Sequence, residues 1–466
     1  MFRKRDRKWI QRICRKKIPA FFAAVMLLSG LVMVDAVKAE EAAERIGPGG
    51  EKFEQADGQG READVMPENI FAAEQLPAVS GSYTLVSAET GKELKGVWFS
   101  YLEWEKFPKE EAAFKQAADV MLDNCVRWGL NAVFLHVHSH TDAMYPSQIL
   151  PWSKFASGTQ GVSPGYDPLG YFVEAAHARG LEVHAWFNPY RVTGYLMRWN
   201  DVSPYSPVKQ WLTDGNTEND RWVLLHEGEY YLNPASPDVR VFVALTVREV
   251  LEKYSVDGIH FDDYFYPNVK DDDPAAWFDR PEYEASGSAL SIADWRRENV
   301  NQLISLVYQT VKGVRPDAVF GVSPQGVIGN LRSDEGMYVD IDRWLSGDGM
   351  VDYIMPQLYW GFEAKTSKGE PASHAFAPNL ASWIELKNKG NVKLYLGLGL
   401  YRAGSNIADN NEVSEWLRYN DILKRQVEMA RSTGAVSGFG FYSYSSFLEG
   451  NAAAEVQNLL PLLKTP

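Results

Sequence analysis

Strand patterns and amphipathic helix patterns alternate along the chain from Leu94 onward, and this alternation limits the possible fold more than any other feature. The eight expected strands are 95–101, 132–138, 182–188, 258–264, 319–324, 353–359, 393–400 and 438–442. The expected helices are 112–128, 169–179, 237–254, 293–314, 379–389, 414–433 and 452–463, with a weaker helical stretch at 336–346. Eight such units predict a single α/β barrel of the (β/α)8 TIM type, with long insertions after strands three and four, rather than two doubly wound domains.

The N-terminal segment has a different character. Residues 1–39 carry ten basic and two acidic side chains, and the stretch 18–34 is apolar and uncharged. This layout predicts a secretory signal peptide at 1–39, with an uncleaved membrane anchor as the alternative. Residues 40–90 are rich in Glu, Ala, Gly and Gln and predict an acidic flexible spacer, which leaves 91–466 for the barrel. We therefore expect a protein that is secreted or located on the outer side of the cell envelope.

The charge balance narrows the possible partners. The chain has a net charge of −14, and residues 40–466 alone hold 37 basic and 59 acidic side chains, a net charge of −22. Such an excess of negative charge repels nucleic-acid phosphates and anionic lipids. We expect no nucleic-acid partner, no membrane partner once the signal is removed, and a neutral or weakly charged substrate. Nothing in the sequence predicts a protein partner.

The fourth expected strand ends in the densest group of polar and aromatic residues, at 256–267. Because side chains alternate along a strand, His260, Asp262 and Tyr264 share one face, and the apolar residues between them face the helix layer. A TIM barrel keeps its active site at the carboxyl ends of its strands. The pattern therefore predicts that Asp262 points into the mouth of the barrel, with Asp263 just beyond the strand.

A carboxyl group in such a mouth is a candidate for breaking glycosidic bonds, either as general acid/base or as nucleophile. Asp262 is the first candidate and Asp263 the second; the alternative for each is a carboxylate that caps a loop or binds a sugar hydroxyl. Glycosidases usually need two carboxyl groups. Glu103, Asp142 and Glu363 follow strand ends and are candidates for the second group, with an orienting or structural role as the alternative for each. Of the three we retain Glu363 as a catalytic candidate and Glu103 and Asp142 as substrate-binding candidates. An N-acetyl group of the substrate acting as internal nucleophile would remove the need for a second carboxylate.

His136, His138 and His140 alternate along the second strand and raise the possibility of a metal site. A barrel metalloenzyme also takes ligands from later strands, yet the fifth, sixth and eighth strands contain no His. The sequence also lacks a phosphate-binding glycine loop and a Gly-x-Ser-x-Gly motif. We therefore predict no metal and no cofactor, and interpret the histidines as hydrogen-bonding groups of the substrate site or as ordinary buried residues.

Aromatic and hydrogen-bonding side chains gather at or just beyond the strand ends. Aromatic rings stack on the C–H faces of sugars, and sugar hydroxyls require donors and acceptors. The candidate stacking residues are Trp98, Tyr145, Trp186, Tyr190, Tyr264, Tyr359, Trp360, Tyr401 and Tyr442. The candidate hydrogen-bonding residues are His136, His138, Asn188, Arg191, Asn233, His260, Gln357 and Arg402. This composition predicts a carbohydrate ligand.

Ordered motifs along residues 94–465 resemble the glycosyl hydrolase-like 10 family of exported bacterial proteins, which includes enzymes of the divisome-localised glycosyl hydrolase type. The matching motifs are Lys95-Gly96-Val97-Trp98, Asp142-Ala143-Met144-Tyr145-Pro146-Ser147, Tyr166-Asp167-Pro168-Leu169, His184-Ala185-Trp186-Phe187-Asn188-Pro189-Tyr190-Arg191, Leu232-Asn233-Pro234, 257–267, Gly321-Val322-Ser323-Pro324 and Met355-Pro356-Gln357-Leu358-Tyr359-Trp360. One departure is His138-Ser139, where many members carry Arg-Pro.

The resemblance implies a barrel glycosidase that acts on bacterial cell-wall glycan, with peptide-stripped strands as the expected substrate. In other barrel glycosidases the inward Asp of the strand-four signature is catalytic or holds the catalytic site, which corresponds to Asp262. Two alternatives remain: hydrolysis of another extracellular polysaccharide, and a non-catalytic barrel that only binds glycan.

Overall fold

The computed structural model describes residues 92–267, 278–334, 336–346, 349–363, 374–387, 391–406 and 415–465. Its centre is a closed parallel barrel with the strand order β1-β10-β9-β8-β7-β6-β3-β2. The barrel strands are β1 (Leu94–Phe99), β2 (Ala132–His138), β3 (Glu182–Phe187), β6 (Gly258–Asp262), β7 (Val319–Ser323), β8 (Tyr353–Ile354), β9 (Lys393–Leu398) and β10 (Gly438–Phe441). The predicted (β/α)8 fold is therefore confirmed.

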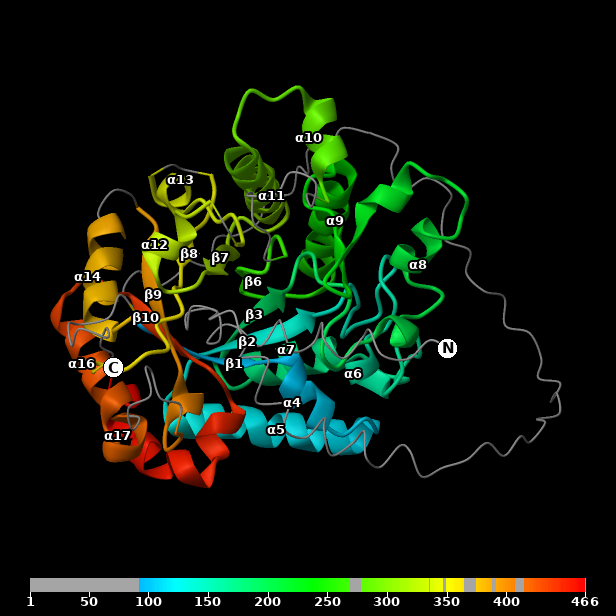
Figure 1. Ribbon diagram of the computed structural model, residues 1–466. Coiled ribbons are helices and arrows are strands. Elements are labelled where there is room, and N and C mark those ends of the chain that lie inside the picture. The colour runs from blue at the N-terminus through cyan, green and yellow to red at the C-terminus, as the bar shows by residue number, and fades with distance from the viewer. Residues whose placement is uncertain are drawn as a thin grey trace, which may run out of the picture. The chain divides into compact units, whose positions relative to one another are not determined.

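The helices surround the strands (Figure 1). They are α5 (Glu111–Trp128), α7 (Pro168–His177), α9 (Pro237–Lys253), α11 (Ile292–Val314), α13 (Ile341–Ser346), α14 (Phe376–Lys387), α16 (Ile422–Ser432) and α17 (Ala453–Leu463). Side chains cap the starts of several: Asp167 accepts a hydrogen bond from Gly170 N at 3.0 Å in α7, and Ser236 and Ser291 cap α9 and α11. The main core lies between strands and helices, where Ile259 and Phe261 of β6 are fully buried, as the alternation predicted.

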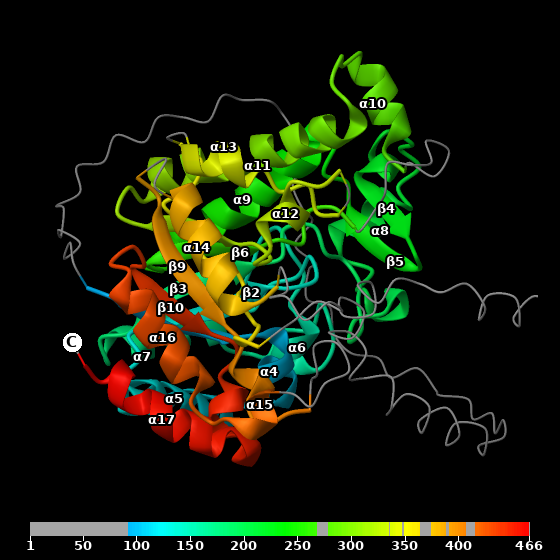
Figure 2. The same ribbon diagram turned by 60° about the vertical axis from the view of Figure 1, so that its left-hand side comes forward.

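Insertions lengthen the loops at the carboxyl ends of the third and fourth barrel strands. The insertion after β3 contains η1 (Trp199–Asp201), α8 (Pro207–Trp211), η2 (Asn219–Trp222) and the hairpin of β4 (Val223–His226) with β5 (Glu229–Leu232). The loop after β6 carries α10 (Arg280–Ser286), which lies beside this hairpin (Figure 2). An ion pair of 2.6 Å between Arg221 and Glu282 joins the two insertions.

The shorter elements complete the barrel ends. They are α4 (Tyr101–Lys106), α6 (Lys154–Ser157), α12 (Ile328–Leu331), η4 (Leu400–Arg402), α15 (Glu415–Arg418), η5 (Ser445–Leu448) and η6 (Gly450–Ala452). The expected helix 414–433 is thus two helices, α15 and α16. The expected strand 353–359 is regular only at Tyr353–Ile354, because Pro356 has no N–H to donate to a ladder. Gln357 nevertheless makes single bridges to Gln325 and Gly397, so the segment stays extended toward the mouth.

Large side chains fill the barrel interior. Trp98, Phe134 and Tyr353 belong to an inner cluster that is separate from the outer core. Glycines on the strands make room for them: a Cβ at Gly321 would lie 2.2 Å from the ring of Tyr353, and one at Gly440 would lie 2.9 Å from Trp98. The interior is therefore a packed floor beneath the mouth, not a channel.

The expected signal peptide at 1–39 and the spacer at 40–90 lie outside the described residues. Within the described ranges, no helix has the length and apolar character needed to span a bilayer. Cys125 is buried with a free thiol on α5, and burial raises its pKa, which agrees with an inert core residue.

Candidate active site

The site is built around Asp262, the last residue of β6, whose side chain is 4% exposed at the carboxyl ends of the strands. Its Oδ2 atom accepts hydrogen bonds from Trp186 Nε1, at 3.1 Å, and from Asn188 Nδ2. Its Oδ1 atom accepts one from Tyr264 N at 3.3 Å. Three N–H donors, from Trp186 in β3, Asn188 directly after β3 and Tyr264 after β6, therefore fix the orientation of this carboxyl group.

Asp263 lies directly beside it and is 6% exposed. Its Oδ2 atom accepts a hydrogen bond of 2.7 Å from Gln325 N, in the loop after β7. No hydrogen bond to its Oδ1 atom occurs within the described part of the chain. Through Oδ2, Asp263 therefore holds the loop after β7, which was one of the two roles expected from the sequence. Its Oδ1 atom remains available to accept or donate a hydrogen bond to a ligand.

The two carboxyl groups have unequal electrostatic surroundings. Burial raises the pKa of Asp262 to about 6, although the charge of Arg191 and the donors from Trp186 and Asn188 act in the opposite direction. Burial and the neighbouring charge of Asp262 raise the pKa of Asp263 to about 7. Near neutral pH the pair therefore holds one carboxylate and one group that readily carries a proton, which is the combination that acid–base catalysis needs.

One wall of the mouth is formed by residues of β2 and β3. The ring of His136 stacks on Trp186, with centroids 3.8 Å apart. The backbone carbonyl oxygen of Asn188 lies 3.1 Å from His138 Nδ1, within hydrogen-bond distance. Through this contact β2 helps to position Asn188, whose side-chain amide donates to Asp262. Sequence analysis predicted all four of these residues as substrate-binding, and the structure brings them together with Asp262.

A second group of predicted residues surrounds Arg191. The guanidinium carbon lies 4.7 Å from the ring centroid of Tyr264, which is 47% exposed. On another side it lies 5.8 Å from the ring of Tyr101, a residue that follows β1. The cation and the exposed ring therefore form a polar and aromatic surface next to Asp262.

The loops after β8, β9 and β10 contribute three tyrosines. The ring of Tyr359 lies edge-on to Tyr401 at 5.8 Å and 6.0 Å from Tyr442. Among the charged neighbours that affect the pKa of Tyr359 is Asp263, which places this cluster near the carboxyl pair. Gln357 and Arg402 brace the same loops: Gln357 donates to Ser323 O at 2.8 Å and Arg402 to Tyr359 O at 2.7 Å.

Several other predicted site residues lie away from the surface of the mouth. Trp98 and His260 are inside the barrel, where Trp98 Nε1 donates to His260 Nε2 at 3.2 Å and His260 Nδ1 contacts Tyr353 Oη at 2.9 Å. Tyr145 and Tyr190 are fully buried in the outer core. These side chains act by packing, because their strand positions direct them below or outside the mouth.

Three more predicted residues hold loops together. Asp142 is fully buried and accepts a hydrogen bond from His140 N at 3.1 Å. Glu103 caps α4 and accepts a hydrogen bond of 2.5 Å from Ser443 Oγ, which ties the loop after β1 to the loop after β10. Asn233 lies at the end of the inserted hairpin and donates to Arg221 O at 2.9 Å.

Glu363 and Trp360 follow β8 at the outer part of the site. Trp360 is half-buried, and its carbonyl accepts a hydrogen bond of 2.7 Å from Gln426 in the helix layer. Glu363 forms an ion pair with Arg418, and both side chains are partly exposed at 38% and 43%. The ion pair with Arg418 is a contact typical of a structural carboxylate. Asp263, which directly follows Asp262, is therefore the better candidate for the second catalytic carboxyl group.

We expect Glu363→Gln to change kcat/KM on the glycan substrate by less than about threefold and stability by under about 1 kcal/mol, because an exposed ion pair contributes little. Steady-state kinetics and thermal unfolding test this. A loss of about 100-fold or more with an unchanged unfolding temperature would instead assign catalysis to Glu363, as the sequence-based hypothesis proposed.

The histidines do not gather enough ligands for a metal among the described residues, where no group of three or more His, Cys, Asp or Glu side chains converges. Burial lowers the pKa of His138 to about 4, and burial together with the charge of Arg191 lowers the pKa of His136 and His140 well below the usual value. All three are therefore neutral at physiological pH. Sequence reasoning missed the role of Gln325, whose contribution is a backbone N–H that no side-chain pattern reveals.

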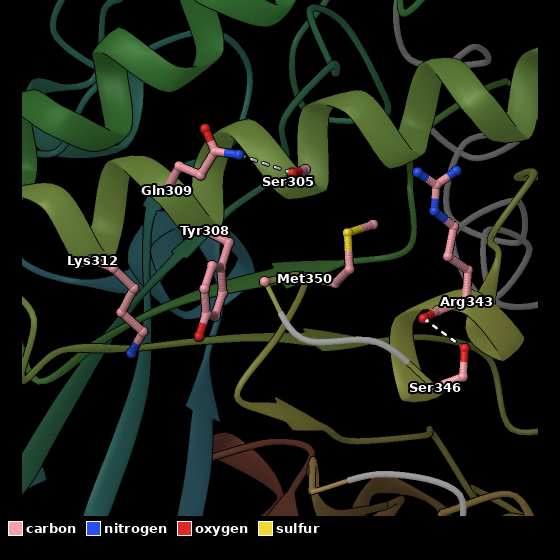
Figure 3. Close-up of a pocket in the computed structure, with 8 residues that line it drawn as sticks. Ser305, Tyr308, Gln309, Lys312, Arg343, Ser346 and Met350 are labelled. Atoms are coloured by element: carbon pink, nitrogen blue, oxygen red, sulfur yellow. Dashed lines mark hydrogen bonds between the residues drawn. The ribbon is translucent and has the colours of Figure 1, made fainter.

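A separate cavity of about 600 Å³ lies on the helix layer between α11 and α13 (Figure 3). Ser305, Tyr308 and Lys312 of α11 line it together with Arg343 and Met350. None of the residues that line it comes from the carboxyl end of a barrel strand. We therefore assign the chemistry to the mouth and not to this cavity.

A closed parallel barrel with adjacent buried carboxyl groups and aromatic rings at its mouth defines the class of barrel glycoside hydrolases. Comparison with known proteins agrees with this class. The chain belongs to the glycosyl hydrolase-like 10 family, whose model matches residues 93–416. The resemblance and the enzyme class expected from the sequence are both confirmed.

Relatives cover most of the chain. Glycosyl hydrolase YngK of Bacillus subtilis strain 168 is 34% identical over 375 residues, which is 75% of this chain and 69% of the relative. Glycosyl hydrolase DigH of Escherichia coli K12 is 31% identical over 394 residues, which is 78% of this chain and 85% of the relative. The solved glycoside hydrolase domain of PgaB (BpsB) from Bordetella bronchiseptica has a TM-score of 0.53 at 14% identity, covers 79% of this chain and 99% of that domain, and shares the fold.

Proposed function

We propose that this enzyme is exported and hydrolyses glycosidic bonds in bacterial cell-wall glycan strands from which stem peptides have been removed. The observation that carries the proposal is the pair of consecutive residues Asp262 and Asp263, both buried at the carboxyl end of β6 in a mouth lined by aromatic rings. The basic and apolar pattern at 1–39 supports export to the compartment where the wall lies. The family and its glycosyl hydrolase relatives support the reaction type.

The two aspartates take different parts in the reaction. Asp263, with a pKa of about 7 and an oxygen free of protein donors, gives its proton to the glycosidic oxygen as the bond to the anomeric carbon breaks. Asp262, with a pKa of about 6 and three N–H donors, stays ionised and balances the positive charge that develops on the sugar. Water then adds to the anomeric carbon: its oxygen becomes the hydroxyl group of the new reducing end, and its released proton returns to the Asp263 carboxylate.

Wall glycan sugars carry N-acetyl groups, and such a group serves as an internal nucleophile in some glycosidases. In that case the Asp262 carboxylate orients the amide N–H and stabilises the charge of the cyclic intermediate. Trp186 donates to Asp262 and the exposed ring of Tyr264 contacts Arg191 beside it, so Tyr264 offers a ring that can stack on a sugar face.

Incubation of purified protein from residue 40 onward with intact peptidoglycan and with amidase-stripped glycan strands tests the proposal, with products read by mass spectrometry. We expect peptide-free oligosaccharides with hydrolysed reducing ends from stripped strands and few products from intact wall. Binding without products would favour the non-catalytic alternative. Cleavage of another extracellular polysaccharide, with neither wall substrate cut, would overturn the proposed substrate while leaving the enzyme class unchanged.

A further inference from the structure

Arg191 is a cation in the mouth of the barrel that forms no ion pair among the described residues, although the Asp262 carboxyl group is near enough for their charges to interact. The loop after β3 fixes its backbone, because Arg191 bridges Tyr231 and its carbonyl accepts a hydrogen bond of 2.9 Å from Thr141 Oγ1. The rings of Tyr264 and Tyr101 contact its guanidinium. Within the described residues the guanidinium donates no hydrogen bond and no carboxylate lies within ion-pair distance. Its planar set of N–H donors is therefore available to a ligand.

Two buried histidines lie near Arg191, and each has a ring nitrogen without a hydrogen-bond partner among the described residues. His136 is 1% exposed, and neither of its ring nitrogens has a hydrogen-bond partner. His140 is 2% exposed, and its Nε2 atom has none. Tyr101 packs edge-on against both rings, with centroids 5.7 Å and 5.1 Å away. Buried polar atoms without partners are rare in folded proteins, so they point to a ligand that supplies the missing contacts.

His140 and Arg191 lie against one glycine, which fixes their proximity. A Cβ at Gly194 would lie 3.3 Å from His140 Nε2 and 3.9 Å from Arg191 Cδ. Because His136 is neutral, it keeps one N–H donor, and Arg191 supplies the positive charge of the group. His140 Nδ1 contacts Ser139 Oγ at 3.0 Å, so His140 donates to a ligand only in the tautomer that carries its proton on Nε2. One cation with neutral donors beside it matches a single small anionic group better than a polyanion.

We propose that Arg191, assisted by His136 and His140, binds a carboxylate carried by the substrate sugar, and that this group is the lactyl carboxylate of N-acetylmuramic acid. The inference rests on the proposed function and specifies its substrate. A guanidinium binds a carboxylate through two parallel hydrogen bonds, which fixes the orientation of the sugar as well as its charge.

The inference gives a physical reason for selecting stripped strands. In intact peptidoglycan the lactyl carboxyl group is joined to the stem peptide by an amide bond, so it carries no charge and is followed by a bulky chain. Removal of the peptide restores the carboxylate. Arg191 then gains an anionic partner only on stripped strands, and the charge of the sugar, not only its size, decides which strands are cut.

The test compares a charged and a neutral form of the same substrate. Stripped strands are used as such and after carbodiimide coupling of their lactyl carboxyl groups to methylamine, which removes the charge and adds little bulk. For the wild type we expect kcat/KM to be about 10- to 100-fold lower on the methylamide strands, the range of a charge-assisted hydrogen bond. Arg191→Gln should cut stripped strands about as poorly and lose the discrimination, while Arg191→Lys keeps part of it. The exposed Arg198→Gln, from the same insertion, is the matched control and should behave as wild type.

The outcomes separate the two proposals. Equal cleavage of both strands by the wild type, or undiminished discrimination by Arg191→Gln, would overturn the carboxylate site while the glycosidase activity on wall glycan stands. If the wild type cuts neither strand, the proposed function fails, and this inference fails with it. Hyaluronan, in which N-acetylglucosamine alternates with a uronic acid, is a further arm: faster cleavage of hyaluronan than of stripped strands would assign the site to a ring carboxylate and overturn the lactyl assignment. The wild-type comparison alone decides the matter if Arg191→Gln does not fold.

Discussion

Replacement of Asp262 by Asn, or of Asp263 by Asn, should lower kcat on stripped glycan strands at least about 1,000-fold, the upper part of the range for loss of a general acid or base. The two variants remove different functions. Asp262→Asn removes the negative charge that stabilises the sugar cation, and Asp263→Asn removes the proton donor. Because both act in one step, the double variant should be little worse than either single one.

Asp257→Asn is the matched control, since Asp257 lies before the same strand at its amino end, opposite the mouth. Its carboxylate accepts a hydrogen bond of 2.7 Å from Val183 N and contacts His177. We expect its kcat to stay within about twofold of wild type. Near-normal turnover by Asp262→Asn or Asp263→Asn, with an unchanged fold by circular dichroism, would contradict the assigned roles.

The same pair predicts the pH dependence of kcat/KM. Activity should rise with pH as Asp262 loses its proton near pH 6 and should fall as Asp263 loses its proton near pH 7, giving a narrow maximum between these values. The charge of Asp262 raises the pKa of Asp263, so in the residual activity of Asp262→Asn the falling limb should move to lower pH. A falling limb that stays in place would show that Asp263 is not the group that titrates.

The alternation of strand and helix patterns was enough to predict the barrel and its eight strands. It succeeded because barrel strands are buried on both faces and their connecting helices are amphipathic, which leaves distinct patterns in the sequence. It was wrong about the length of strand six, where Pro356 interrupts the ladder, and about the division of 414–433 into α15 and α16. Both errors concern local hydrogen bonding, which side-chain periodicity does not record.

The alternation along β6 also predicted the position of Asp262, because one residue of register decides which face of a strand a side chain occupies. Other site residues were harder to place. Trp98 and His260 share a face with site residues but lie deeper in the barrel, and depth depends on strand tilt and on glycines such as Gly321 and Gly440. The contacts of residues in loops were not predictable from side-chain alternation. Glu103 follows a strand end, yet it caps a helix and accepts a hydrogen bond from Ser443 in the loop after β10.

A buried ion pair, Arg296 with Asp279, fastens the loop after β6 to α11. Both side chains are 0% exposed, and Arg296 donates to the two carboxylate oxygens at 2.8 Å and 2.6 Å. A third donor reaches Tyr338 Oη at 2.8 Å, and the guanidinium lies 5.8 Å from the ring of Tyr266. Tyr266 is four residues beyond Asp262, so the ion pair supports the chain that follows the proposed catalytic pair.

Arg296→Met should therefore cost about 3–5 kcal/mol of unfolding free energy, because it leaves the Asp279 carboxylate buried without its partner. In the double variant Arg296→Met, Asp279→Leu most of the loss should return, since the penalty lies in the unpaired charge rather than in the absence of attraction. The exposed pair of Arg332 with Asp342, at 2.7 Å, provides the control: Arg332→Met should cost under about 1 kcal/mol, because water screens both groups. Urea unfolding of the four proteins at pH 7 measures these differences. A cost for Arg296→Met equal to that of Arg332→Met would contradict the prediction, and would mean that the loop after β6 is held by its aromatic packing alone.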